Sequence, residues 1–135
     1  MFEVPMYRKN GSRIELQNLL EKVPANDWVW LIIEFDGVAN LPNDESIDGF
    51  QNRIRCLPKG LVKTWEDILS FSRCVDYTID CLIVAVSCME QVGVEKLLGD
   101  DFQNCLVFIR AIDSTDWMLH ASNSEILDGL KVVTG

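Results

Sequence analysis

Two aspartates that directly follow predicted strands are the residues best placed for chemistry. Asp36 follows the apolar run that ends at Phe35, and Asp113 follows the run that ends at Ile112. If those strands are parallel neighbours, both carboxylates reach one edge of a sheet, where open α/β folds bind ligands. Converging carboxylates can hold Mg²⁺ or share acid–base work, which is the chemistry of a small metal-dependent enzyme. The alternative is structural, because Asp-Gly and Asp-Ser are ordinary turn sequences.

His120 is the only histidine, so any Cys–His or Ser–His nucleophile pair would have to use it. Strand alternation predicts that His120 and Met118 share a face opposite Trp117 and Leu119. No Gly-x-Ser-x-Gly elbow is present to supply a nucleophile, and one histidine without a Cys or His cluster does not make a zinc site. We therefore expect a half-exposed strand histidine, no catalytic residue, no metal and no cofactor.

The segment from Ala25 to Asn52 holds six carboxylates and no lysine or arginine. Acids outnumber bases 21 to 12 over the whole chain, which gives a formal charge of −9. Such an imbalance adds self-repulsion to the folded state, so a concentrated acidic surface suggests a positively charged partner. It argues against direct binding of nucleic acid or of an anionic membrane, since both need lysine and arginine.

Aromatic residues accompany several of these acids. Position parity predicts that Trp28 and Trp30 share a strand face with Glu34 and Asp36. Tryptophan can anchor a protein interface beside carboxylates, or it can belong to the core. We expect core positions for Trp28, Trp30 and Trp65. Trp117 is the tryptophan expected to be exposed, because it follows a predicted turn.

The pattern of elements positions these residues in an α/β or α+β fold. Apolar runs predict strands at 28–35, 79–87, 105–112 and 117–121, with a short one at 50–57. Helices are expected after caps at Ser12, Thr64 and Ser122, and over 89–98, while 36–48 should be a polar loop. Alternating helices and strands favour one mixed sheet of about four to five strands covered by helices, and residues 1–135 should form a single globular domain.

The chain has an odd number of cysteines, five, and no Cys-x-x-Cys pair, so it suggests neither a disulfide framework nor a zinc ribbon. The start lacks a basic segment followed by an apolar one, and no apolar run reaches membrane-spanning length. These features predict a cytoplasmic protein.

In size, charge and layout the chain resembles the small acidic immunity proteins of contact-dependent growth inhibition and other polymorphic toxin systems of bacteria. The stretch from Phe108 to Trp117, running into the last predicted helix, is also similar to segments of short bacterial proteins. This resemblance implies an inhibitor that occludes the active site of a cognate toxin, with a basic, nuclease-type toxin as partner.

We expect two groups of residues to contact that partner. The first is the acidic loop, with Asp36, Asp44, Glu45 and Asp48, and the second is the turn with Asp113, Asp116 and Trp117. A self-associating interaction domain and the small metal-dependent enzyme remain as alternatives.

Overall fold

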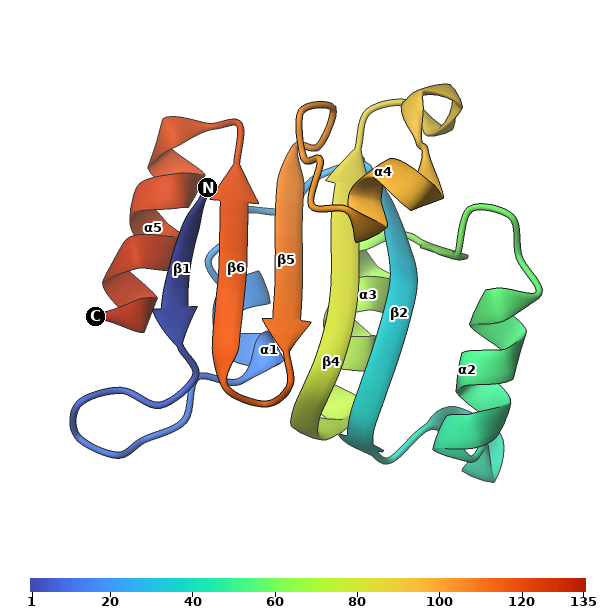
Figure 1. Cartoon of the computed structure of the whole chain (residues 1–135), viewed down its shortest axis with the longest axis horizontal. Coiled ribbons are helices and arrows are strands. Elements are labelled where there is room, and N and C mark those ends of the chain that lie inside the picture. Colours follow the sequence, from blue (N-terminus) through green and yellow to red (C-terminus); the bar gives the residue numbers. More distant parts are fainter.

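The chain folds around one antiparallel sheet of six strands (Figure 1). The computed structural model describes residues 1–135. The strands lie in the order β1-β6-β5-β4-β2-β3, and each neighbouring pair is antiparallel. They span Phe2–Pro5 (β1), Val29–Ala39 (β2), Leu61–Lys63 (β3), Val75–Val86 (β4), Val107–Ile112 (β5) and Asp116–Ala121 (β6).

Five α-helices and two 3-10 turns join the strands. The helices are Leu16–Leu20 (α1), Ile47–Arg55 (α2), Trp65–Cys74 (α3), Val94–Leu98 (α4) and Ser124–Thr134 (α5), and the 3-10 turns are Pro42–Asp44 (η1) and Met89–Gln91 (η2). In Figure 1, α1 and α3 lie behind the sheet, α4 lies in front of the upper end of β4, and α2 stands beside β2. None of the helices combines the length and the apolar character that crossing a bilayer requires.

The two faces of the sheet are covered unequally. A cluster of 27 buried residues, including Trp30, Phe35 and Trp117, packs the rear face against α1, α3 and α5. A cluster of only 8 buried residues, including Val84 and Phe108, lies on the front face with α4 and its flanking loops. The front face is therefore covered at one end and open at the other.

The predicted single sheet with helices is confirmed, but the mixed sheet of four to five strands is wrong in detail. The two strands missing from the prediction, β1 and β3, have only 4 and 3 residues and lie at the edges of the sheet. Runs this short show little alternation.

The expected strand at 50–57 is also wrong, because residues 50–55 belong to α2. Ser46 caps this helix by accepting a hydrogen bond from the Gly49 backbone N–H at 3.0 Å. Phe50 and Ile54, four residues apart, form its buried face.

The other expected elements are present with shifted ends. The strand at 28–35 continues to Ala39, so the acidic loop is shorter than predicted, and Asp36 lies inside β2. The helix expected over 89–98 is interrupted before Val94, with Gly93 as the N-cap of α4. Glu15, not Ser12, is the N-cap of α1, and Asn123, not Ser122, caps the last helix.

Candidate functional site

The uncovered part of the front face carries two rows of side chains that cross five strands. Cross-strand pairing places Glu34, Leu82, Arg110, Met118 and Glu3 in the first row, running from β2 to β1. The second row contains the pair Asp36 and Asp80, followed by the paired residues Ile112, Asp116 and Pro5. Asp80 and Ile112 each lie one residue beyond Cys81 and Ala111, the pair that ends the β4–β5 ladder. We call these ten residues the open face.

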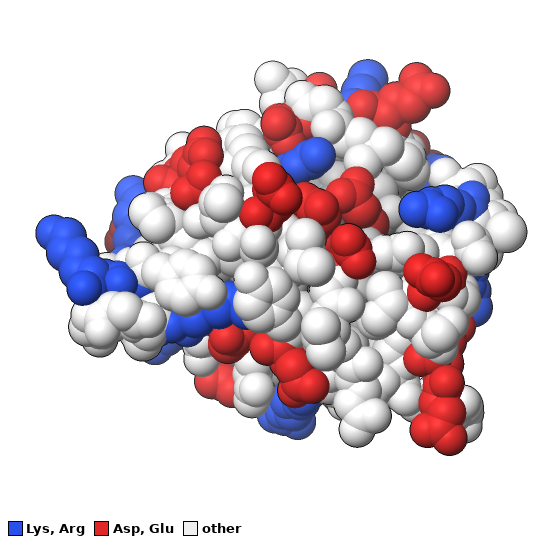
Figure 2. Space-filling model, turned by 60° about the horizontal axis from the view of Figure 1, so that its bottom comes forward, with Lys and Arg blue, Asp and Glu red and all other residues white.

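Five carboxylates share the open face with one base, Arg110. The Arg110 guanidinium lies 3.1 Å from Asp100, which is outside the open face, and it donates a hydrogen bond to the Leu98 carbonyl. None of the five carboxylates forms an ion pair. Figure 2 shows a group of acidic side chains near the middle of the view, next to a basic side chain, and further acidic and basic side chains toward its edges. The open face therefore carries negative charge that the chain does not neutralise.

Asp36 and Asp80 lie directly opposite each other on β2 and β4. Like charges directly opposite each other on neighbouring strands destabilise a sheet. Asp80 has a structural role as well, because its Oδ1 accepts a hydrogen bond from the Asp113 backbone N–H at 2.9 Å. The Asp36 side chain makes no hydrogen bond or ion pair within the chain, so its charge has no structural role that the contacts reveal.

A groove of about 500 Å³ opens at the β2 end of the open face. Three carboxylates of the open face line it, those of Glu34, Asp36 and Asp80. Its apolar lining includes Ile54 near the end of α2, Leu57 just after that helix, and Val94 and Leu98 of α4. It is thus a hollow with both a negative and an apolar surface.

Hydrogen bonds attach both walls of this groove to their surroundings. Gln51 of α2 donates to the Phe35 carbonyl of β2 at 2.9 Å. On the α4 side, Arg110 holds the Leu98 carbonyl at 3.1 Å. Lys59 donates to the Met89 carbonyl at 2.6 Å and so links the segment after α2 to η2. These attachments make the groove a preformed feature of the fold.

The two aspartates predicted to converge do not lie on neighbouring strands. β2 and β5 run in the same direction, but β4 lies between them. Asp113 occupies the β5–β6 turn with φ of 48°, and its N–H is held by Asp80. No group of three or more His, Cys, Asp and Glu side chains is arranged to hold a metal ion. The turn interpretation of Asp113 is confirmed.

The prediction that Trp117 is exposed is wrong. Its side chain is 0 % exposed, and the indole N–H donates to the Ile14 carbonyl at 3.1 Å. Strand alternation turns Trp117 to the rear face and its neighbour Asp116 to the open face. Trp117 is therefore a core residue rather than a partner contact, whereas the half-buried side chain of Asp116 can be reached by a partner.

The predicted acidic loop does not form one surface. Asp44 belongs to η1, Asp48 lies in the first turn of α2, and both are exposed. Glu45 forms a two-bond ion pair with Arg53, at 2.8 and 3.1 Å, so its charge is neutralised within the chain. Of the four acids predicted in this segment, only Asp36 belongs to the open face.

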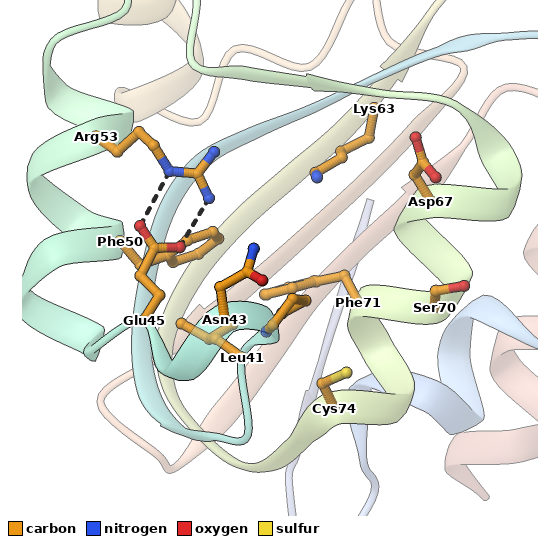
Figure 3. Close-up of a pocket in the computed structure, with 11 residues that line it drawn as sticks. Leu41, Asn43, Glu45, Phe50, Arg53, Lys63, Asp67, Ser70, Phe71 and Cys74 are labelled. Carbon is orange, nitrogen blue, oxygen red and sulfur yellow. Dashed lines mark hydrogen bonds and ion pairs between the residues drawn. The ribbon is translucent and has the colours of Figure 1, made fainter.

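The Glu45–Arg53 pair stands at a second hollow, of about 520 Å³, between η1, α2, β3 and α3 (Figure 3). Phe50 and Phe71 stack at its base with ring centroids 5.5 Å apart, and Lys63 points into it. The charged side chains of this second hollow have both signs, so it selects no ligand class by charge.

The sequence did not identify Glu3 and Asp80 as site residues, and it placed Glu34 on the wrong face. A β-bulge between Ile32 and Glu34 reverses the alternation, so Trp30 faces the rear core while Glu34 faces front. Only the pairing register joins these acids into rows.

His120 is half-buried on the front side of β6, as expected, with its ring centroid 4.4 Å from that of Phe102. Burial, and secondarily the charge of the chain N-terminus, lower the pKa of His120. No acid or nucleophile is hydrogen-bonded to this imidazole, so the contacts describe a packing role.

No protein-family model, curated protein or solved structure matches this chain.

Proposed function

We propose that this protein is an inhibitor that binds a basic protein partner through the open face, in the manner of a cytoplasmic immunity protein that occludes the active site of a nuclease-type toxin. The observation that carries the proposal is the pair of rows with five carboxylates and no ion pair among them. Because mutual repulsion of these charges opposes folding, recognition explains them better than stability does.

The open face suits occlusion of a wide, basic cleft. Strands are spaced about 4.8 Å apart, so the carboxylates of Asp36 and Asp116, on strands separated by three spacings, span about 14 Å. Ile112 and Met118 are half-buried, lie between the acids and offer apolar contact area, while Leu82 is fully buried beneath them. Lysine and arginine side chains that normally hold phosphates would meet carboxylates instead. Opposite potentials would also speed association, toward about 10⁸ M⁻¹s⁻¹ at low salt.

Affinity capture with matched variants tests this proposal. The wild-type protein, an Asp36→Lys/Asp116→Lys variant and an Asp27→Lys/Asp128→Lys control are used as baits in lysate of the source organism. The two variants change the net charge equally, but Asp27 and Asp128 are exposed residues outside the open face. We expect the wild type and the control to retain one stoichiometric basic protein that the open-face variant loses. Equal retention by all three baits would contradict the proposal.

A further inference from the structure

The groove at the β2 end of the open face has both an apolar and an acidic lining. Leu57 and Leu98 are large apolar side chains that stay 39 % and 41 % exposed, and both line it. The carboxylate-bearing residues Glu34, Asp36 and Asp80 line the same hollow. An occupant that satisfies both surfaces needs an apolar stem and a cationic head.

We infer that, if the open face binds a protein partner as proposed, this groove receives an arginine side chain of that partner. The aliphatic part of the side chain would lie against the exposed leucines and cover apolar surface that now faces water. The guanidinium would reach the facing carboxylates of Asp36 and Asp80. Its charge would relieve the repulsion between these two groups, neither of which forms an ion pair within the chain.

Arginine fits this groove better than lysine for geometric reasons. The facing residues Asp36 and Asp80 have Cβ atoms about 5 Å apart, as in any directly opposed antiparallel pair. A planar guanidinium has five N–H donors in a fixed fork, so it can bond two carboxylates at once, and it is more weakly hydrated than an ammonium group. A lysine ammonium would keep more of its water and lack this fork geometry.

Two arginines of the chain itself border this region and must be taken into account. Arg110 is already engaged with Asp100 and the Leu98 carbonyl, so it helps to form the α4 wall. Arg55 lines the groove, is exposed and makes no ion pair, so its positive charge opposes a cationic occupant. Removing the charge of Arg55 should therefore strengthen binding of an arginine side chain.

The experiment uses Nα-acetyl-arginine amide as a probe, because it carries the arginine side chain without terminal charges. Its binding is followed by backbone amide shifts in NMR spectra of the full chain, with the citrulline analogue as the uncharged isostere and the lysine analogue as the alternative cation. We expect saturable shifts confined to residues that line the groove, and a dissociation constant about tenfold weaker for citrulline.

Matched variants locate the binding. Asp36→Asn should weaken arginine binding about tenfold, because one charged partner is lost. Arg55→Gln should strengthen arginine binding. Asp116 lies on the open face but outside the groove, so Asp116→Asn should leave arginine binding unchanged. Amide spectra confirm that each variant is folded.

Several results would overturn the inference. They are equal binding of citrulline or lysine, shifts spread over the whole open face, or equal weakening by Asp116→Asn and Asp36→Asn. The proposed function is tested separately, because the affinity capture described above does not depend on binding of free arginine. If the arginine probe does not bind while the open-face variant loses its partner, the groove assignment is wrong and the inhibitor proposal stands. If the arginine probe binds but no partner is retained, the groove assignment stands and the inhibitor proposal is wrong.

Discussion

Asp36→Asn should make the folded protein more stable, although it removes a charged residue from the sheet. The carboxylate of Asp36 faces that of Asp80 across two neighbouring strands and has no compensating contact. Cross-strand pairs change stability by about 0.2–1 kcal/mol, and opposed like charges have the unfavourable sign. We take a cost of that size for this pair, and asparagine removes it while keeping the size of the side chain. The expected gain corresponds to about 1–4 °C in the midpoint of thermal unfolding for a domain of this size.

Urea unfolding at 25 °C measures this gain directly. In low salt the midpoint of Asp36→Asn should rise while the slope m stays unchanged, because the same surface is exposed on unfolding. In 1 M NaCl the screening length falls from about 10 Å to about 3 Å, so the gain should shrink. Asp27→Asn, an exposed acid outside the open face, reports what any loss of one negative charge does. A loss of stability in Asp36→Asn, or a gain no larger than in this control, would refute the reasoning.

Three other predictions concern residues away from the open face. Trp117→Phe should lower the free energy of unfolding by about 1–3 kcal/mol, because the buried Ile14 carbonyl loses its indole donor; unchanged chemical unfolding would contradict this. Burial lowers the pKa of His120, so its contribution to stability is present above about pH 6.5 and is lost as the pH falls below that value. The wild type should therefore lose more thermal stability between pH 7 and 5.5 than His120→Asn does, and parallel curves would show that the histidine is not responsible. Cys56 is exposed and should react with a thiol reagent in the native state, whereas burial raises the pKa of the Cys81 thiol to about 12 and should block its reaction until unfolding; mass spectrometry of labelled peptides distinguishes the two.

The central part of the fold could be predicted from the sequence because its signals are local. Long apolar runs identified β2 and β4, and the capping residue Thr64 identified the start of α3. α2 was missed because Phe50 and Ile54 are its only buried residues, and a short segment with two apolar positions fits a strand equally well. The edge strands were missed because hydrogen bonding to a neighbour, rather than their own sequence, defines them.

The candidate site could be predicted only in part, because it depends on pairing between distant segments. Asp36 and Asp116 were identified as acids beside strands, and both lie on the open face. Their neighbours Glu3 and Asp80 join them only through the strand order, which sequence periodicity does not reveal. The burial of Trp117 likewise follows from alternation within β6, which outweighed its position after a turn.

The most direct test of the central claim is protection of growing cells. The basic protein retained by the wild-type bait is expressed in a bacterial host together with the wild-type chain, the Asp36→Lys/Asp116→Lys variant or the Asp27→Lys/Asp128→Lys control, each at equal abundance. Growth should be arrested by the partner alone, restored by the wild type and the control, and not restored by the open-face variant. Continued arrest in the presence of the wild-type chain, or full protection by the open-face variant, would contradict the account of an inhibitor that acts through this face.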